Sequence, residues 1–326
     1  MSEAASVKVC ASCDYQTISD ALHALPNDNQ SYTVSIAAGV YNERIWVNRS
    51  NVNLEAAGSG KVYIQYSIAH NTQDPSSHAW EKAVVTVNGN NVSFRNLVLS
   101  NTFKQTRNIA TVALNVQGQK VSFYKTKIYG FQDTLLISAA GTAYFKDCYV
   151  EGSVDFIFGY GVGYFQGCVI GSNAVGYVTA QNRASESATG GFYFNQCHMK
   201  ATIPSGPIAS NADNTLSFTS NTQFANSTYL GRPWSQYARV VYMNSYFENH
   251  IKPAGWSIWK ATDPRINHVL FGEYKNNGPI GSFGSLRAPF ASLLNSTDIA
   301  HYKPFPAIDC ALKEKGCIEK AFGLHK

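Results

Sequence analysis

The sequence has few charged residues and no long apolar segment. Asp, Glu, Lys and Arg make up 14% of its 326 residues, whereas 44% are hydrophobic and 13% aromatic. This balance excludes an intrinsically disordered chain and suffices for one large core or two small ones. No apolar run approaches the ~18 residues of a membrane span, and the opening residues lack the basic and apolar regions of a signal peptide. We therefore expect no membrane partner, and a signal peptide that is absent or already removed.

The charge of the chain is mildly basic but not concentrated. With 26 Lys and Arg against 21 Asp and Glu, the formal net charge is +5. The basic residues never form the run that follows a nucleic-acid backbone, so no nucleic-acid partner is expected. The pI of about 8.7 suits an anionic polymer substrate, although a solvated basic surface would also explain it. Sequons compatible with glycosylation lie at Asn48, Asn91, Asn226 and Asn295.

The chain is predicted to be mostly β-structure after one short helix. Apolar residues follow helical spacing from Ile18 to Leu25, after the capping residue Thr17. Later segments rich in Val, Ile, Tyr and Phe alternate with turn residues. Five of these segments share one pattern, a Phe followed three residues later by a small or apolar residue. The pairs are Phe94 and Leu97, Phe123 and Thr126, Phe145 and Cys148, Phe165 and Cys168, and Phe194 and Cys197.

The spacing of these repeats predicts the fold. The Phe residues are 29, 22, 20 and 29 positions apart, and short strands at such a period are typical of a solenoid whose equivalent side chains form ladders. We predict an all-β parallel β-helix, one domain over residues 1–326, with a short N-terminal capping helix and a loop-rich C-terminal region. The tail from about residue 298 should pack along the solenoid. A β-sandwich is the alternative, but neither Asn-Gly pair lies between two alternating strands.

The seven cysteines leave the disulfide pattern open. Cys168 and Cys197 occupy the same position of successive repeats, where a coil spacing of ~4.8 Å would permit a disulfide. A ladder of reduced, buried thiols is the alternative. The Cys-x-x-Cys pair near the N-terminus has no second pair or histidine set, so we expect no metal site there. The other pairings that the sequence permits are Cys10 with Cys13 and Cys310 with Cys317.

Two aspartates are the candidate chemical groups. The sequence contains no Gly-x-Ser-x-Gly, His-Glu-x-x-His, Walker or Rossmann motif, which removes support for a serine hydrolase or a nucleotide-binding protein. Asp133 and Asp155 are 22 residues apart, so a solenoid would place them on adjacent coils, ~5 Å from each other. One carboxylate should then be driven toward its protonated state, while a cation, for which Arg232 is the candidate, stabilises the other. Taken singly, each aspartate could instead cap a turn.

These residues lie in motifs that together resemble those of the pectin methylesterases, carbohydrate esterases that demethylate homogalacturonan. The resemblance spans about residues 14–290, and the central motifs are specific in combination. In chain order the motifs are DYQTI (14–18), GVYNE (39–43), QDTL (132–135), DFIFG (155–159), TAQNR (179–183), LGRPW (230–234), PAGW (253–256) and GEY (272–274).

The resemblance implies a right-handed parallel β-helix with a shallow substrate groove and without cofactor or metal. It implies that Asp155 attacks the ester carbonyl and forms an acyl-enzyme. Asp133 would protonate the departing methanol and then activate water. Arg232 would keep Asp155 ionised, and Gln132 would donate a hydrogen bond to the tetrahedral oxyanion.

The resemblance also implies a substrate and a location. Trp234, Phe158 and Arg232 would contact the sugar chain of methyl-esterified homogalacturonan, with core packing as the alternative for Phe158. The protein would be a secreted, extracellular monomer, and the compact chain is more similar to a microbial, fungal-like member than to a plant one.

One departure from the family pattern concerns the oxyanion site. Family members begin the segment that matches residues 110–114 with a second glutamine, and this chain has Ala110 there. Loss of one oxyanion donor typically costs about 2.7–4 kcal/mol, so turnover should be reduced unless Thr111, Asn108 or a water replaces the amide. Leu136 also stands where the family commonly has an aromatic residue.

Two other functions remain open at the level of the sequence. Ala110 makes a pectin-binding protein with little or no turnover an alternative to an active esterase. A lyase or glycosidase acting on the pectin backbone is disfavoured, because no cluster of three or four acidic residues recurs at coil spacing.

Overall fold

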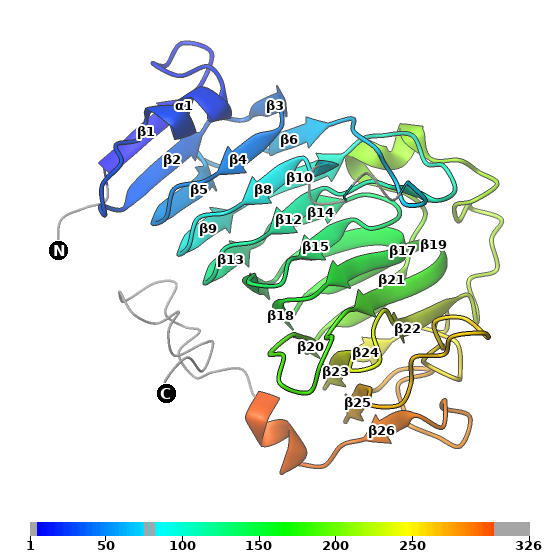
Figure 1. Cartoon of the computed structure of the whole chain (residues 1–326). Coiled ribbons are helices and arrows are strands. Elements are labelled where there is room, and N and C mark those ends of the chain that lie inside the picture. Colours follow the sequence, from blue (N-terminus) through cyan, green and yellow to red (C-terminus); the bar gives the residue numbers. More distant parts are fainter. Residues whose placement is uncertain (1–4, 75–77, 79–81, 303–326) are drawn as a thin grey trace.

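The chain folds into a parallel β-helix, as the repeats predict. The computed structural model describes residues 5–74, 78 and 82–302. Its strands form two large sheets in which each coil pairs in parallel with the next (Figure 1). This pairing rules out the β-sandwich. The strands of the first sheet, sheet A, are β1 (Ala5–Val9), β2 (Tyr32–Ile36), β5 (Val52–Ala56), β9 (Val92–Arg95), β13 (Val121–Tyr124), β16 (Thr142–Lys146), β18 (Val162–Gln166), β20 (Gly191–Asn195), β23 (Arg239–Met243), β25 (Leu270–Tyr274) and β26 (Ala291–Leu293).

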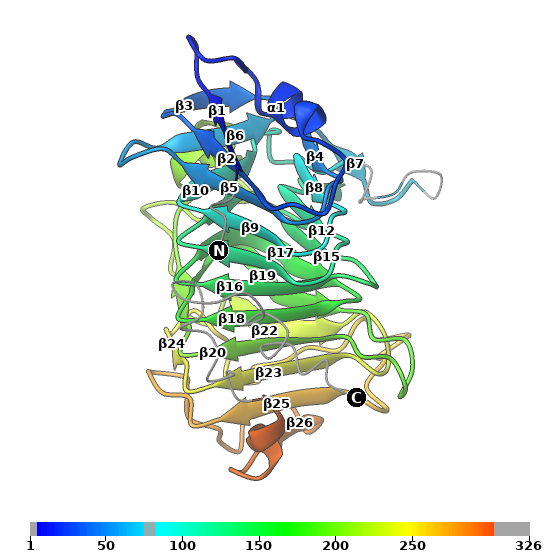
Figure 2. The same cartoon turned by 90° about the vertical axis from the view of Figure 1, so that its left-hand side faces the viewer.

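The second sheet, sheet B, forms two sides of the solenoid, because two of its strands run around a bend. The first half of β17 pairs with β14 and its second half with β15, and β19 continues in the same way to β21 and β22. With sheet A, each central coil therefore has three sides stacked along one axis (Figure 2). The strands of sheet B are β3 (Gly39–Asn42), β4 (Ile45–Val47), β6 (Val62–Tyr66), β8 (Val85–Val87), β10 (Leu97–Asn101), β12 (Leu114–Val116), β14 (Lys127–Tyr129), β15 (Leu135–Ile137), β17 (Tyr149–Gly159), β19 (Val169–Gln181), β21 (His198–Ala201), β22 (Thr228–Pro233) and β24 (Tyr246–Phe247).

The corner between sheet A and sheet B is made by one residue per coil with a left-handed backbone. Asn and Asp tolerate this conformation better than most residues, because their short polar side chains can hydrogen-bond locally, and glycine takes it without a steric penalty. The corner residues of successive coils, with φ between 47° and 63°, are Asn96, Lys125, Asp147, Gly167, Gln196, Asn244 and Lys275.

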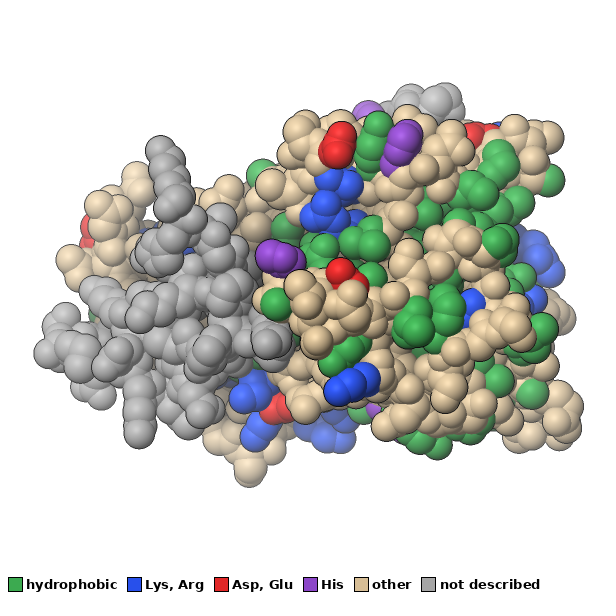
Figure 3. Space-filling model, turned by 90° about the horizontal axis from the view of Figure 1, so that it is seen from below, with side chains coloured by type: hydrophobic (Ala, Val, Ile, Leu, Met, Phe, Trp, Pro, Cys, Tyr) green, Lys and Arg blue, Asp and Glu red, His purple; other side chains and the backbone are tan. Residues whose placement is uncertain are grey.

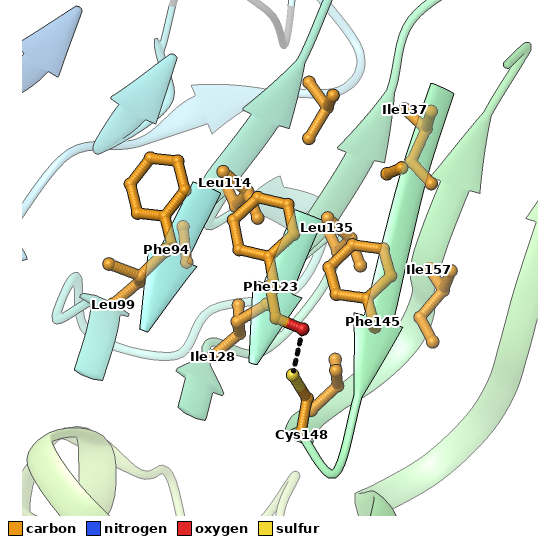
Figure 4. Packing of buried hydrophobic residues seen from close by; sticks show 14 of the residues in the cluster. Phe94, Leu99, Leu114, Phe123, Ile128, Leu135, Ile137, Phe145, Cys148 and Ile157 are labelled. Carbon is orange, nitrogen blue, oxygen red and sulfur yellow. Dashed lines mark hydrogen bonds between the residues drawn. The ribbon is translucent and has the colours of Figure 1, made fainter. Parts of the chain in front are cut away.

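The predicted phenylalanine ladder fills the centre of the solenoid. Phe94, Phe123 and Phe145 pair in register, and their ring centroids are 4.9 and 4.7 Å apart (Figure 4). Phe165 and Phe194 continue the stack at 4.5 and 4.6 Å. All five rings are fully buried, and each stacked pair adds about 0.5–1.5 kcal/mol to the stabilisation from buried area. The ladder therefore fixes the register of the coils.

The cysteines of the repeat form a reduced ladder. The thiol of Cys148 contacts the carbonyl oxygen of Phe123 at 3.4 Å (Figure 4), and Cys168 and Cys197 repeat the contact one and two coils later. The alternative of a disulfide between Cys168 and Cys197 is wrong, because both thiols are free. Equivalent side chains of parallel coils point in the same direction, and a disulfide needs side chains that converge.

The remaining cysteine pairs lie near the ends of the chain. Cys10 and Cys13 form a disulfide with a Cα–Cα distance of 5.0 Å. The predicted pairing of Cys310 with Cys317 lies outside the described residues.

The N-terminal end of the solenoid is covered by the predicted helix, α1 (Ile18–Ala24). The Thr17 hydroxyl accepts the amide of Asp20 at 3.0 Å, and the carboxylate of Glu43 accepts the amides of Ile18 and Ser19, so these exposed donors of the first turn are satisfied. The short 3-10 helix η2 (Gly206–Asn211) lies in the loop between β21 and β22. No helix among the described residues is both long and apolar enough to cross a membrane.

The C-terminal tail begins with the 3-10 helix η3 (Asp298–Tyr302). Tyr302 stacks on Tyr193 of sheet A, with the ring centroids 5.0 Å apart. Residues 303–326 lie outside the described part of the chain, so the predicted course of the tail stays a prediction there.

Figure 3 shows the lower end of the molecule, where basic and acidic side chains are scattered among polar and apolar ones.

Candidate active site

The two predicted aspartates lie on adjacent coils at the corner inside sheet B. Leu135 of β15 pairs with Ile157 of β17, so the chain positions two residues earlier, Asp133 and Asp155, are neighbours. The amide of Asp133 donates to the carbonyl of Val154 at 3.0 Å. Both aspartates have a left-handed backbone, with φ of 59° and 52°. The spacing of 22 residues therefore predicted this juxtaposition correctly.

Arg232 binds Asp155 through two parallel hydrogen bonds. Its Nε donates to Oδ1 at 2.9 Å and its Nη2 to Oδ2 at 2.6 Å, the two-point geometry that makes arginine–carboxylate pairs strong. The guanidinium lies 4.1 Å from the ring centroid of Tyr177 and 4.4 Å from that of Trp259. Gly231 lets β22 approach β19, because a Cβ there would come within 2.1 Å of the Thr179 hydroxyl.

Neither aspartate caps a turn within the described residues. The Asp155 carboxylate is engaged by Arg232, and the Asp133 carboxylate accepts no hydrogen bond from any described side chain or amide. The exposed fractions of Asp133 and Asp155 are 9% and 6%. Both carboxylates are thus held at the floor of a site rather than used in local structure.

Burial and charge separate the proton affinities of the two carboxyls. Burial, and then the negative charge of Asp155, raise the pKa of Asp133 well above its ordinary value, and Arg232 only partly opposes them. Burial leaves the pKa of Asp155 above its ordinary value as well, but here the hydrogen bonds and charge of Arg232 act directly against the rise. Asp133 therefore retains its proton at a pH where Asp155 has lost its own, the division that acid–base chemistry needs.

Arg232 itself stays charged in this setting. Burial lowers its pKa, but the hydrogen bonds and charge of Asp155 raise it, and the net pKa lies above the ordinary value. The pair is therefore an ion pair, with the guanidinium beside the Asp155 carboxylate.

A pocket of about 520 Å³ opens above these groups. The other predicted site residues, Gln132, Phe158 and Trp234, line it together with Asp133, Asp155 and Arg232. All six predicted site residues therefore meet at one place. The remaining lining residues are His70, Thr72, His78, Asn108, Leu136, Tyr160, Ala180 and Trp259.

The aromatic residues of the pocket differ in exposure. Phe158 is only 4% exposed and packs with Leu136 and Ala180 in a small apolar cluster outside the main core, so much of its ring serves packing. Trp234 is partly exposed, with its ring centroid 6.1 Å from that of Phe158 and 5.3 Å from that of Tyr160. Trp234 and Tyr160, together with the partly exposed Trp259, thus present the accessible aromatic surface.

The strand that contains Ala110 supplies no side-chain amide in place of the missing glutamine. Ala110 is 1% exposed and belongs to the same apolar cluster as Phe158. The hydroxyl of Thr111 accepts the amide of Phe131 and contacts the carbonyl of Gln132 at 3.2 Å. Of the residues expected to replace the missing amide, Thr111 is therefore committed to the backbone, and Asn108 lines the pocket.

Several residues that line the pocket or contact Arg232 were not predicted from the sequence, among them the following four. Tyr177 and Trp259 enclose the guanidinium, Tyr160 extends the aromatic wall, and His70 reaches the pocket from the ribbon of β7 (His70–Asn71) and β11 (Ile109–Ala110). Tyr160 follows the DFIFG motif directly and could have been found there. The other three lie in loops or strands whose distance from the aspartates along the chain carries no signal. Within the described ranges, no group of three or more His, Cys, Asp or Glu side chains could hold a metal ion.

Comparison with known proteins identifies the family. The chain matches the pectinesterase family over residues 4–308. It is 32% identical over 300 residues to a pectinesterase of Daucus carota, covering 89% of this chain and 88% of the relative. It is 34% identical over 271 residues to pectinesterase/pectinesterase inhibitor U1 of Solanum lycopersicum, covering 81% of this chain but 43% of that longer relative.

A solved structure agrees with this assignment. The pectin methylesterase from carrot superimposes with a TM-score of 0.78 at 30% identity, covering 93% of this chain and 92% of the other. These relatives are plant proteins, so the fungal-like origin stays a prediction. The fold, the ordered motifs and the matched length together show that the chain belongs to the pectinesterase family.

Proposed function

We propose that the protein hydrolyses the C6 methyl esters of homogalacturonan to carboxylate and methanol. The observation that carries the proposal is the pair of adjacent buried aspartates, one bound in two-point fashion by Arg232 and the other free of hydrogen bonds from the described residues. The extracellular location and the monomeric state expected from the sequence remain part of the proposal.

The geometry supports a two-step reaction. An Oδ atom of Asp155 attacks the ester carbonyl carbon, and the carbonyl π electrons move to oxygen, where Gln132 donates a hydrogen bond. Collapse of this intermediate expels the methoxy group, which takes the proton of Asp133 and leaves as methanol. Asp133, now a carboxylate, removes a proton from water, and the hydroxide attacks the acyl-enzyme and releases the galacturonate. Trp234 would hold a sugar ring against its accessible face.

Methanol release from methylated pectin tests the proposal. Asp155→Asn should lower the rate by three orders of magnitude or more, on the scale of removing an enzymatic nucleophile. Asp147→Asn is the matched control, because Asp147 is an exposed corner residue with φ of 53° outside the pocket. Equal rates for the wild type and Asp155→Asn would refute the role of this site.

Ala110 supports a second candidate function, a pectin-binding protein with negligible turnover. Its apolar, buried position leaves Gln132 as the only amide side chain of the predicted oxyanion pair. This function predicts affinity of the wild type for galacturonan fragments without methanol release. Restoration of methanol release by Ala110→Gln would then identify the missing donor as the cause.

A further inference from the structure

The oxyanion of an ester hydrolase is commonly stabilised by more than one donor, and the described pocket offers a second one on the strand beside Ala110. The ribbon of β7 and β11 pairs Ala110 directly with His70 in antiparallel register. Residues opposite each other in such a pair point to the same face, with Cβ atoms about 4.5–5.5 Å apart. The imidazole therefore lies on the same face as the Ala110 methyl group.

That face is the one that looks into the pocket. The Ala110 methyl packs with Leu136 and Phe158, both of which line the pocket. His70 and Thr72, which alternate along the chain and so share a face, line the pocket as well. His70 is 7% exposed, so its ring is held by its surroundings and is not a mobile surface side chain.

The strand order places His70 on the same side of the pocket as the oxyanion amide. The amide of Thr111 donates to the carbonyl of Gln132 at 2.8 Å, so the segment containing Ala110 lies between Gln132 and His70. A small side chain at position 110 leaves room for the imidazole to extend toward the ester above Gln132. A neutral imidazole carries one N–H donor and can polarise a carbonyl without transferring its proton.

We propose that His70 is a catalytic residue of the esterase, which donates its ring N–H to the developing oxyanion beside Gln132. The inference rests on the proposed function. As Asp155 forms its bond to the carbonyl carbon, the π electrons move to the carbonyl oxygen, and this oxygen accepts hydrogen bonds from Gln132 and His70. No proton is transferred, and the hydrogen bond weakens again when methanol leaves.

Steady-state methanol release by a set of variants tests this role. Removal of one oxyanion donor typically lowers kcat by about 10²–10³-fold, so His70→Ala should show such a loss with KM within about threefold of the wild type. His70→Gln supplies an amide donor from the same position and should recover at least part of the loss. Ala110→Gln in the His70→Ala background should do the same from the neighbouring strand, whereas Ala110→Gln alone should gain little.

Asn71→Ala is the matched control, because Asn71 belongs to the same strand, is exposed and does not line the pocket. Thermal unfolding of each variant separates a loss of fold from a loss of chemistry. A His70→Ala enzyme within threefold of the wild type, a loss confined to KM, or a folded His70→Ala enzyme that neither amide variant improves would overturn the inference while leaving the proposed function intact. Absence of methanol release from the wild type would overturn both.

Discussion

Replacement of Arg232 by lysine is the sharpest perturbation of the site, because it keeps the positive charge and removes the two-point contact. The guanidinium makes two hydrogen bonds to Asp155, at 2.9 and 2.6 Å. A lysine ammonium is a point charge on a flexible chain and can retain one of them at best. The variant therefore isolates the contribution of the second bond and of the fixed orientation.

The size of the effect follows from the bond that is lost. A hydrogen bond to a charged group contributes about 1.5–3 kcal/mol, which corresponds to about a 10- to 150-fold decrease in kcat/KM. Arg232→Ala removes both bonds and leaves a buried carboxylate without its partner, so its loss should be larger. The rings of Tyr177 and Trp259, at 4.1 and 4.4 Å from the guanidinium, would also lose their planar partner.

The pH profile gives a second, independent readout. In the proposed mechanism Asp155 must be deprotonated to attack, so the rate should rise as pH increases through its pKa. Arg232 lowers that pKa against the effect of burial, and its weakening should move the acidic limb of the profile to higher pH. The basic limb reports the pKa of Asp133. Burial and Asp155 raise this pKa more than Arg232 lowers it, so the basic limb should move to higher pH by less than the acidic limb does.

Methanol release measured across the acid and neutral range provides both readouts. Arg95→Lys is the matched control, because Arg95 stacks on Tyr124 at 4.1 Å and does not line the pocket. An Arg232→Lys enzyme with an unmoved acidic limb and an unchanged kcat/KM would show that the guanidinium neither orients Asp155 nor keeps it ionised.

Three further predictions concern stability and packing. Asp133→Asn should abolish methanol release but raise the free energy of unfolding at neutral pH. The pKa of Asp133 is higher in the folded than in the unfolded state. The carboxyl group therefore stabilises the fold fully below its unfolded pKa, and this stabilisation is lost as pH rises through the folded pKa, by about 1.4 kcal/mol for each unit between the two values. Urea unfolding at acid and neutral pH checks that the gain in stability from Asp133→Asn vanishes in acid. Phe145→Ala should cost about 3–5 kcal/mol in urea unfolding, because Phe145 stacks on both neighbours at 4.7 and 4.5 Å, and Phe145→Leu should cost less. Cys148, Cys168 and Cys197 are at most 3% exposed, so peptide mapping after alkylation without a reductant should find them unmodified in the native protein and modified once it unfolds. Rapid labelling of the native protein would contradict their burial, and cysteines that stay unmodified after unfolding would contradict the reduced ladder.

The fold was predictable because one feature of the sequence is repeated. A Phe at intervals of 20 to 29 residues has no reason to recur in a sandwich, whereas stacked coils require equivalent side chains at equivalent positions. The period of the coils also predicts the neighbouring positions of Asp133 and Asp155. The period does not distinguish a disulfide from free thiols at Cys168 and Cys197, because coil spacing alone does not reveal the direction in which side chains point.

The rest of the site depends on loops, whose length varies between coils. Trp259 reaches Arg232 from a segment after β24, and His70 reaches the pocket from a two-residue strand. Neither obeys the period of the solenoid, so no spacing rule could place them. Arg232 lies 77 residues from Asp155, so the repeat did not place it. The need for a cation beside two carboxylates made Arg232 a candidate, and the resemblance to the family then assigned it to Asp155.

The position of the two aspartates shows how the solenoid accommodates a pair of adjacent buried carboxyl groups. Corners of a parallel β-helix need residues that tolerate a left-handed backbone, at a cost of about 1–2 kcal/mol for most side chains. Asp133 and Asp155 have the same left-handed backbone as corner residues such as Asn96 and Asp147, but they lie at the bend inside sheet B, where Asp155 falls in an irregularity of the β17–β19 register. Because β15 and β17 pair in register, the two aspartates become neighbours, and the like charge that adds to the effect of burial in raising the pKa of Asp133 follows from this pairing.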